Sequence, residues 1–255
     1  MVVDVRDGGP GSLRRGGDAM ALTKSKVDQL GERLRQGAHT DDDLRLLDQY
    51  RRSFGEAYHA VVQTLLRLRQ APTGRPAKST GAIIAKLRRE SIRLSQVQDI
   101  AGCRIVVEHV PAQDELVQAL SVAFPKMAVI DRREKPSNGY RAVHLVVEAA
   151  GSLIEVQVRT SLQHLWAELS EKAADVLDPL IKYGGGPSDL QADLMAFSGG
   201  VAYIEGEEER YLRAGPFGQA PKALAQHKAH FVAALKELID GIDRLRTMED
   251  EPCSS

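Results

Sequence analysis

Two carboxylates of this chain stand beside strand-like runs of apolar residues. Asp99 precedes one such run in "QVQDIAGCRIVV", and Glu155 lies inside another, "LIEVQVRT". In the second run Glu155, Gln157 and Arg159 alternate with apolar residues, so the three share one face of a strand. If neighbouring strands bring Asp99 next to Glu155, the pair makes a hard oxygen site suited to Mg²⁺. The spacing permits this arrangement, although any half-exposed strand shows the same alternation.

A polar stretch, "EKPSNGYRAVH" at residues 134–144, leads into a further strand-like run. It holds Lys135, Asn138, Tyr140 and His144 close together in sequence. Asn138 is followed by glycine, a pair typical of a tight turn, so one interpretation is a surface hairpin with solvated charges. The other interpretation is a binding site, because only 5% of the residues are aromatic and Tyr140 is one of few flat rings available for stacking.

A basic segment, "GRPAKSTGAIIAKLRRE", precedes both carboxylates. Its helical spacing puts Lys86 and Arg89 on one face and lets the apolar residues point inward. Such charge runs are commonly solvated helix faces. The same residue types also suit a triphosphate, since lysine supplies a point charge and arginine supplies planar, bidentate donors. The cations of the segment are Arg75, Lys78, Lys86, Arg88 and Arg89.

The composition is that of a globular protein without a strong charge bias. Of 255 residues, 43% are hydrophobic and 27% are charged, and the net charge of −1 argues against general electrostatic binding of nucleic acid. Cys103 and Cys253 lie far apart and fit reduced thiols rather than a disulfide framework. No apolar run reaches the roughly 18 residues of a membrane span, and residues 1–20 lack the apolar core of a signal peptide. We therefore predict a cytoplasmic protein with a disordered extension at 1–20 and no membrane contact.

Periodicity predicts helices before, between and after a group of strands. The predicted helices are 22–36, 40–70, 80–93, 111–124, 160–178, 188–213 and 221–247. The predicted strands are 103–110, 126–134, 141–150 and 153–160, with a tight hairpin at Gly151-Ser152. Thr40 is a good helix start, because a capping residue is followed by aspartates at the positive end of the helix dipole. This order predicts an α+β fold with a mixed, largely antiparallel sheet, a crossover helix and helical flanks.

Four motifs follow one another along roughly residues 45–175. They are "R-x-x-K…K-L-x-R", "D-I-A-G-x-R-I-V", "K-P-x-N-G-Y-R-x-x-H" and "E-V-Q-V-R-T…H-x-W-A-E". In this order they resemble the synthetase domain of the RelA/SpoT family, the alarmone synthetases. The resemblance implies a nucleotidyltransferase-like mixed sheet flanked by helices, with N- and C-terminal helical extensions. It suggests a synthetase domain at 21–183, a C-terminal helical region at 184–247 and a flexible tail at 248–255.

The resemblance implies transfer of pyrophosphate from ATP to the 3′-hydroxyl of GDP or GTP, giving (p)ppGpp and AMP. Asp99 and Glu155 would be the catalytic residues and would hold Mg²⁺, and Tyr140 would stack on guanine. His164 and Trp166 would pack and orient the start of a helix. The implied ATP-binding residues are Arg75, Lys78, Lys86, Arg89 and Arg104. The implied GDP- or GTP-binding residues are Lys135, Asn138, Tyr140, His144, Gln157 and Arg159.

The chain departs from the family pattern in its basic segment. One extra residue lies between Arg75 and Lys86, and Ala82 stands where the family usually has serine, which affects the fine geometry expected for ATP. No His-Asp dipeptide occurs, so we expect neither the hydrolase domain of the long relatives nor their regulatory region, and predict a small synthetase.

Two other functions stay open. One is a toxic small synthetase that makes an adenosine alarmone or pyrophosphorylates tRNA 3′ ends, although the near-neutral charge weakly disfavours tRNA. The other is an inactive nucleotide-binding regulator, against which the presence of both Asp99 and Glu155 argues. The amphipathic helix at 221–247 could join copies of the chain into a homo-oligomer, or it could cover its own domain.

Overall fold

The computed structural model of the chain describes residues 22–214 and 221–250, apart from the side chains of Arg75 and of 248–250. The predicted disordered extension at 1–20 lies outside the described residues, and so do residues 251–255 of the predicted tail. The last helix, α8 (Lys222–Asp250), continues past the predicted end at 247.

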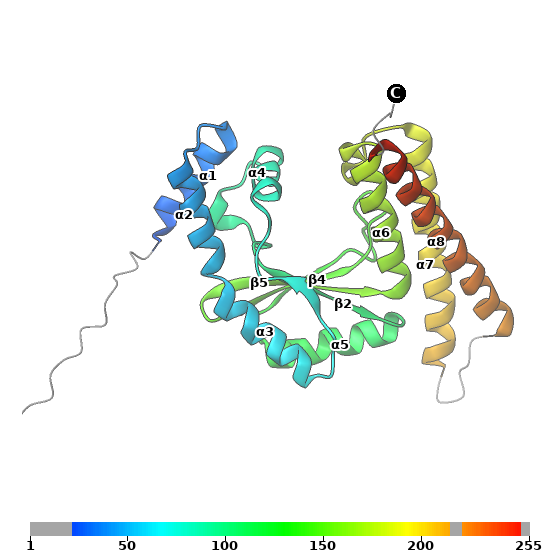
Figure 1. Cartoon of the computed structure of the whole chain (residues 1–255). Helices are drawn as coiled ribbons and strands as arrows, with labels where there is room; N and C mark the ends of the chain where they lie inside the picture. Colours follow the sequence, from blue (N-terminus) through cyan, green and yellow to red (C-terminus); the bar gives the residue numbers. More distant parts are fainter. Residues whose placement is uncertain (1–21, 215–220, 251–255) are drawn as a thin grey trace, which may run out of the picture.

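A five-stranded sheet lies at the centre of the fold (Figure 1). Its strands are β1 (Thr73–Arg75), β2 (Gly102–Val107), β3 (Ala128–Asp131), β4 (Val143–Ala149) and β5 (Ser152–Thr160). They lie in the order β1-β2-β5-β4-β3, with β2 and β5 parallel and the other neighbouring pairs antiparallel. The predicted mixed, largely antiparallel sheet is confirmed. The edge strand β1 was not predicted, because three residues are too few to show an alternation.

Helices cover one face of the sheet and rise in two groups from the other. The covering helices are α3 (Gly55–Arg67) and α5 (Val110–Ala123), of which α5 is the crossover that leads from β2 towards β3 (Figure 1). One group consists of α1 (Lys24–Gln36), α2 (Asp41–Arg52) and α4 (Thr80–Arg89). The other consists of α6 (Ser161–Val176), α7 (Ser188–Arg213) and α8, with the short 3₁₀ helix η2 (Pro179–Tyr183) after α6.

The alternation of β5 decides which side chains face the space between the two helical groups. Ile154, Val156 and Val158 are fully buried in a core to which the covering helices α3 and α5 contribute. Because side chains alternate along a strand, Glu155 and Gln157 point to the opposite face. The sheet therefore presents a polar row where the helical groups stand.

The helix predicted over 40–70 is two helices, α2 and α3, so that prediction was wrong. Thr40 starts α2 as expected: its hydroxyl accepts from the N–H of Asp43, whose carboxylate accepts from the N–H of Thr40. The break between α2 and α3 lies at Ser53, whose hydroxyl donates to the carbonyl of Tyr50 at 2.6 Å. Serine side chains compete with the helix backbone in this way and favour helix ends.

The hairpin between β4 and β5 turns one residue earlier than predicted. Its central residues are Ala150 and Gly151, with φ angles of 44° and 75°, and Ala149 pairs with Ser152. Two positive φ angles are what a tight hairpin needs to match the twist of its strands. A hairpin was therefore predicted correctly at this place, with its centre shifted by one residue.

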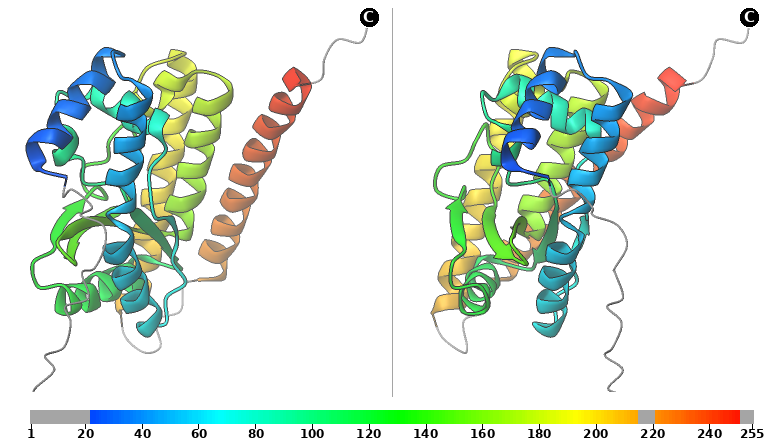
Figure 2. Two further views of the ribbon diagram at one scale, coloured as in Figure 1. Left: turned by 60° about the vertical axis from the view of Figure 1, so that its left-hand side comes forward. Right: turned by 90° about the vertical axis from the view of Figure 1, so that its left-hand side faces the viewer.

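Helix α8 covers its own domain. Leu235 and Ile239 are buried in a second core that α8 shares with α6 and α7, and Figure 2 shows α8 on the outside of this group. Leu238 and Leu245 on the same helix are exposed, so homo-oligomerisation through α8 stays a prediction. Within residues 22–214 and 221–250, no helix is both long and apolar enough to cross a membrane.

Candidate active site

The polar row of β5 forms part of a cavity of about 590 Å³. The parallel register places Glu155 opposite Gly102 and Gln157 opposite Arg104. A side chain at Gly102 would lie within 2.8 Å of the backbone oxygen of Glu155, so glycine permits this close approach. The predicted site residues that line the cavity are Lys78, Asp99, Arg104, Glu155, Gln157 and Arg159. The two carboxylates therefore meet in one cavity, as the sequence permitted.

Asp99 lies just before β2, between two lysines of the basic segment. Its Oδ2 atom lies 2.5 Å from Nζ of Lys78, and its Oδ1 atom lies 3.0 Å from Nζ of Lys86. Burial favours the neutral carboxyl, but the hydrogen bonds and charges of the two lysines outweigh it, so the pKa of Asp99 lies below its usual value. The prediction assigned Asp99 to a metal and the lysines to ATP, whereas the structure joins all three in one cluster.

Glu155 is held by two neighbours on the same face of the sheet. Its Oε1 atom lies 2.8 Å from Nδ1 of His144 on β4, and its Oε2 atom accepts from Nε2 of Gln157 at 2.8 Å. Burial raises the pKa of Glu155 and the charge of Asp99 acts the same way, but the bonds from His144 and Gln157 prevail and keep that pKa below its usual value. Glu155 is therefore a charged carboxylate with fixed orientation.

The hydroxyl of Tyr140 stands at the other end of this hydrogen-bond chain. It lies 2.9 Å from Nε2 of His144, and it accepts from Nη2 of Arg159 at 3.0 Å. The Arg159 guanidinium is buried and lies over the tyrosine ring, with Cζ 5.0 Å from the ring centroid. Because burial raises the pKa of Tyr140, the hydroxyl keeps its proton at neutral pH. Tyr140, His144 and Glu155 thus form one continuous chain of side chains.

The stretch before Tyr140 is a tight turn, as the hairpin interpretation predicted. Asn138 and Gly139 have φ angles of 50° and 84°, and the N–H groups of Ser137 and Tyr140 each bond to the other's carbonyl. Asn138 and Tyr140 also line a cavity of about 120 Å³. The turn therefore carries two of the predicted binding residues into the site. Lys135, by contrast, is exposed and does not line either cavity.

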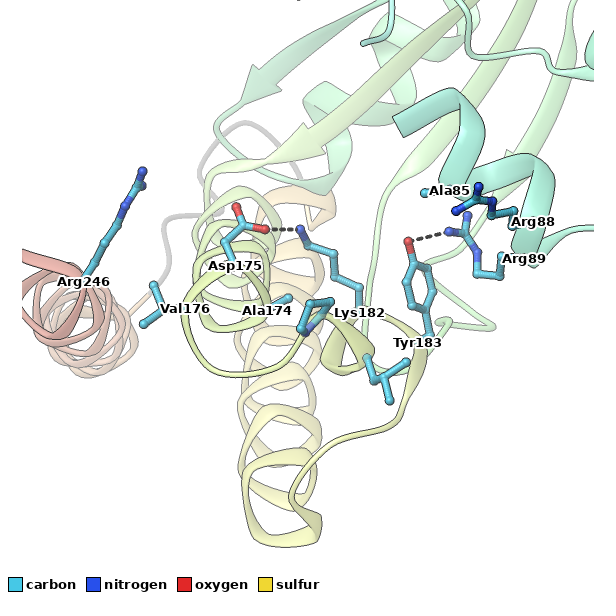
Figure 3. Close-up of a pocket in the computed structure, with 11 residues that line it drawn as sticks. Ala85, Arg88, Arg89, Ala174, Asp175, Val176, Lys182, Tyr183 and Arg246 are labelled. Carbon is cyan, nitrogen blue, oxygen red and sulfur yellow. Dashed lines mark hydrogen bonds and ion pairs between the residues drawn. The ribbon is translucent and has the colours of Figure 1, made fainter. Parts of the chain in front are cut away.

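A third cavity, of about 950 Å³, adjoins the carboxylates' cavity and lies between α4, η2, the end of α6 and α8 (Figure 3). Arg89 lines it, and Nη1 of Arg89 donates to the hydroxyl of Tyr183 at 2.7 Å. The guanidinium also lies over the Tyr183 ring, 4.1 Å from its centroid. The structure thus places Arg89 beside the cavity of Asp99 and Glu155 rather than in it.

Two residues of the site lie outside the sequence motifs themselves. Lys182 of η2 lines all three cavities and bonds Asp175 at 2.7 Å, as Figure 3 shows. Glu171 of α6 lines the cavity of the two carboxylates and lies 3.8 Å from Arg104. Neither has a pattern that would have distinguished it from a surface charge. The side chain of Arg75 lies outside what the structure describes, although its backbone pairs with Gly102.

The residues predicted to pack at the start of α6 behave differently from one another. Trp166 is buried, and its Nε1 donates to the carbonyl of Leu194 on α7 at 2.8 Å, which confirms a packing role. His164 is half-buried, and burial together with the charges of Arg104 and Arg159 lowers its pKa. A neutral imidazole beside these arginines fits an orienting role and carries no charge towards the cavity.

The carboxylates fit the part that a protein usually plays in a magnesium site. Mg²⁺ commonly takes one or two carboxylates and completes its shell with water and substrate phosphates. Asp99 and Glu155 line one cavity, and each has a pKa below its usual value, so both offer charged oxygens. Among the described residues, no group of three or more His, Cys, Asp or Glu side chains could hold a metal. A metal at this pair would therefore complete its shell with water or with the phosphates of a bound nucleotide.

Comparison with known sequences places a family region across the site. Residues 74–174 match a family described as "Region found in RelA / SpoT proteins". An uncharacterized protein of Mycobacterium tuberculosis is 37% identical over 123 residues, which are 47% of this chain and 45% of that protein. A probable GTP diphosphokinase, RSH3 of Arabidopsis thaliana, is 28% identical over 147 residues, which are 51% of this chain and 20% of that protein. The chain thus spans less than half the length of these curated relatives.

Solved structures share the fold. Small alarmone synthetase 2 from Bacillus subtilis superimposes with a TM-score of 0.54 at 20% identity, over 66% of this chain and 99% of that one. Small alarmone synthetase 1 from the same organism superimposes with a TM-score of 0.51 at 25% identity, over 69% of this chain and 97% of that one. The predicted α+β fold, with a mixed sheet and flanking helices, is confirmed by these likenesses.

Proposed function

We propose that this chain transfers pyrophosphate from ATP to the 3′-hydroxyl of GDP or GTP, a proposal supported by the match of residues 74–174 to a region found in RelA/SpoT proteins. The observation that carries this proposal is the meeting of Asp99 and Glu155 in one cavity that basic side chains also line. A mere nucleotide-binding module has little use for two charged carboxylates beside bound phosphates. One relative of the same fold, small alarmone synthetase 1 of Bacillus subtilis, has been solved bound to its product pppGpp.

The basic cluster supports the ATP part of the proposal. Lys78 and Lys86 both contact Asp99, and Arg104 lines the same cavity. A triphosphate entering here would offer these lysines several oxygens in place of one carboxylate. Asp99 would then be available to a Mg²⁺ ion bound to the same phosphates. Positioning and charge neutralisation are what phosphoryl-type transfer chiefly needs, because its transition state is loose.

The chain from Tyr140 to Glu155 supports the acceptor part. Glu155 is charged and fixed by His144 and Gln157, so it can accept the proton of a 3′-hydroxyl that reaches it. The freed oxygen would attack the β-phosphorus of ATP, and the bond from that phosphorus to the oxygen shared with the α-phosphate would break. AMP leaves with this bridging oxygen, and the pyrophosphate ends on the acceptor. Mg²⁺, held by Asp99 and Glu155, would supply charge neutralisation on the phosphates.

The proposed acceptor site lies at Tyr140 and the turn that precedes it. Tyr140 is the ring that we propose to stack on guanine, together with Asn138 from the turn. In the structure Arg159 lies over this ring, so a base would use another part of the ring or displace the guanidinium. Stacking alone accepts any base, since every base has a π-face. Guanine selectivity would have to come from polar contacts around the ring.

Product analysis with a panel of acceptors tests the function. Purified protein is incubated with ATP and Mg²⁺ and, separately, with GDP, GTP, AMP, ADP or tRNA, and the products are resolved by ion-exchange chromatography and mass spectrometry. The proposal predicts one new 3′-pyrophosphorylated guanine nucleotide with GDP or GTP. A product with the adenine nucleotides or with tRNA alone would favour the toxic-synthetase alternative. No product with any acceptor, beside tight nucleotide binding, would favour an inactive regulator. A cytoplasmic location and a homo-oligomer stay predictions, to be checked by fractionation and by light scattering.

A further inference from the structure

We propose that the helical region after the family region clamps the acceptor turn, with Ser198 of α7 as its positioning residue. The acceptor turn is the turn at residues 137–140 that carries Asn138 and leads into Tyr140. Ser198 lies outside residues 74–174, and the sequence motifs assigned it no role. This inference rests on the proposed function in naming the turn as the acceptor's, while the clamp itself rests on contacts alone.

Ser198 ties the turn to α7 by two hydrogen bonds. Its hydroxyl donates to the carbonyl of Gly139 at 2.6 Å and accepts from Nε of Arg141 at 3.1 Å. Nη1 of the same arginine donates to the carbonyl of Arg133, so the chain is fixed on both sides of the turn. Ser198 is 2% exposed, so bulk solvent does not compete for these bonds. A buried hydroxyl that both donates and accepts specifies one position of the turn.

The fit around Gly139 is close enough to define that position. Gly139 has a φ angle of 84°, and a Cβ there would lie 2.7 Å from Cζ2 of Trp166 and 3.2 Å from Cβ of Ser198. Trp166 is itself fixed by its bond to the carbonyl of Leu194 on α7. The turn therefore sits directly against a tryptophan and a serine that α7 holds in place.

A second contact reaches the turn from the loop after η2. Gly184 has a φ angle of 81°, and a Cβ there would lie 2.7 Å from Oδ1 of Asn138. Gln191 on the first part of α7 secures this loop, because its Nε2 donates to the carbonyls of Ile181 and Gly185. Two separate parts of the C-terminal region thus converge on the two central residues of the turn.

The clamp has a consequence for the acceptor and not for ATP. The turn positions Tyr140, and the hydroxyl of Tyr140 connects through His144 to Glu155. The cations proposed for ATP lie on other elements, with Lys78 before α4 and Lys86 on it. Loosening the turn should therefore weaken binding of the acceptor nucleotide and leave ATP binding unchanged. We infer that the C-terminal region determines acceptor affinity through the turn.

The test compares Ser198→Ala with the wild type and with Ser188→Ala, a control at an exposed serine on the same helix. Hydrogen exchange of the free full-length proteins is followed in peptides that cover 134–144, where the amides of Ser137 and Tyr140 bond within the turn. The inference predicts that these peptides exchange faster in Ser198→Ala than in the wild type, and that Ser188→Ala exchanges at the wild-type rate. Calorimetry should then show GDP binding weakened about 3- to 10-fold, the scale of one hydrogen bond's net contribution, with binding of a non-reacting ATP analogue unchanged.

Each outcome decides one part of the inference. Unchanged exchange at 134–144 in Ser198→Ala overturns the clamp, whatever nucleotide the protein binds. Faster exchange with unchanged GDP affinity overturns the acceptor role, and so does an equal loss of GDP and ATP-analogue affinity. Gly184→Ala, which presses on Asn138 from the other side, should repeat the selective loss if the first variant is too unstable to study. Wild-type protein that binds no guanine nucleotide would overturn the proposed function, while the exchange result would still decide the clamp.

Discussion

Nδ1 of His144 lies 2.8 Å from Oε1 of Glu155. The two residues stand on neighbouring antiparallel strands, and His144 uses its other ring nitrogen to contact the hydroxyl of Tyr140. A histidine with Nδ1 donating to the carboxylate has Nε2 available to accept from tyrosine. His144 is thus the link between the carboxylate proposed as base and the ring proposed for the acceptor.

Replacing His144 by alanine should shift the pH dependence of transfer. Glu155 must be ionised to accept a proton, and burial opposes that ionisation while the bond from His144 supports it. Without the bond the pKa of Glu155 rises, so the acidic limb of the rate profile should move to higher pH. We also expect a loss of about 10- to 100-fold in kcat, as for other orienting partners. An unchanged acidic limb would show that Glu155 is not the base.

Asp99→Asn and Glu155→Gln should each lower the transfer rate by about 10²- to 10⁴-fold, with folding intact. Each change removes a negative charge from the cavity while keeping the shape of the side chain. Rates are measured across a titration of Mg²⁺, with Asp193→Asn at an exposed position of α7 as control. Near-wild-type turnover in either variant would remove that residue from the proposed magnesium site.

Arg89 and Arg88 offer a matched pair on one helix. Both line the large cavity, but their guanidinium groups have different partners: that of Arg89 lies over Tyr183, whereas Arg88 donates to the backbone carbonyl of Arg35. Arg89→Ala should raise the KM for ATP and spare binding of the acceptor in the absence of ATP. Arg88→Ala should change neither value by more than about twofold. If Arg89→Ala weakened binding of ATP and of GDP equally, Arg89 would serve both nucleotides or only the structure.

Tyr140→Phe and Tyr140→Ala separate the ring from its hydroxyl. Phenylalanine keeps the ring, so GDP affinity should hold, but it leaves His144 and Arg159 without the hydroxyl, and the rate should fall about 10-fold. Alanine removes the ring and should weaken GDP binding by about 1–3 kcal/mol. Calorimetry and a thermal melt of each variant measure both effects. GDP affinity equal to wild type in Tyr140→Ala would exclude a stacking role.

The capping pair at the start of α2 gives a stability prediction that does not depend on function. Hydrogen bonds from Arg33 hold the pKa of Asp43 at about 2, below its usual 3.8. A carboxyl whose pKa is lowered by folding stabilises the protein at pH values above the pKa of the unfolded chain. This stability is lost as the pH falls towards 2. Asp43→Asn should therefore lower the free energy of unfolding by about 1–2 kcal/mol at neutral pH. The variant has no carboxyl to protonate at this position, so it should not show the acid-dependent loss of stability. Urea unfolding at several pH values measures this, with the exposed neighbour Asp42→Asn as control.

The sheet and the central carboxylates could be predicted because their signals are local. Alternation along β5 identified the polar face that carries Glu155 and Gln157, and the order of the motifs implied a neighbouring position for Asp99. The Asn138-Gly139 turn follows from residue types that tolerate positive φ. These features need only a few consecutive residues to be recognised.

The contacts that complete the site could not be predicted, because they join segments far apart in the chain. The bond between Arg89 and Tyr183 spans two helical groups, and the bond of Ser198 to Gly139 joins α7 to the turn. A lone tyrosine or serine in a helical region has no spacing that indicates such a partner. The strand β1 and the break at Ser53 were missed for a related reason, since each is too short for a periodic pattern to show.

The fate of the two outer phosphates of ATP distinguishes pyrophosphate transfer from transfer of a single phosphate. ATP labelled either at the β-phosphate or at the γ-phosphate is incubated with the protein, Mg²⁺ and GDP, and the label in each product is counted. Pyrophosphate transfer predicts both labels in the guanine product in equal amounts, one AMP per product, and neither label transferred by Glu155→Gln. Transfer of the γ-label alone with release of ADP, or no transfer of either label by the wild-type protein, would contradict it.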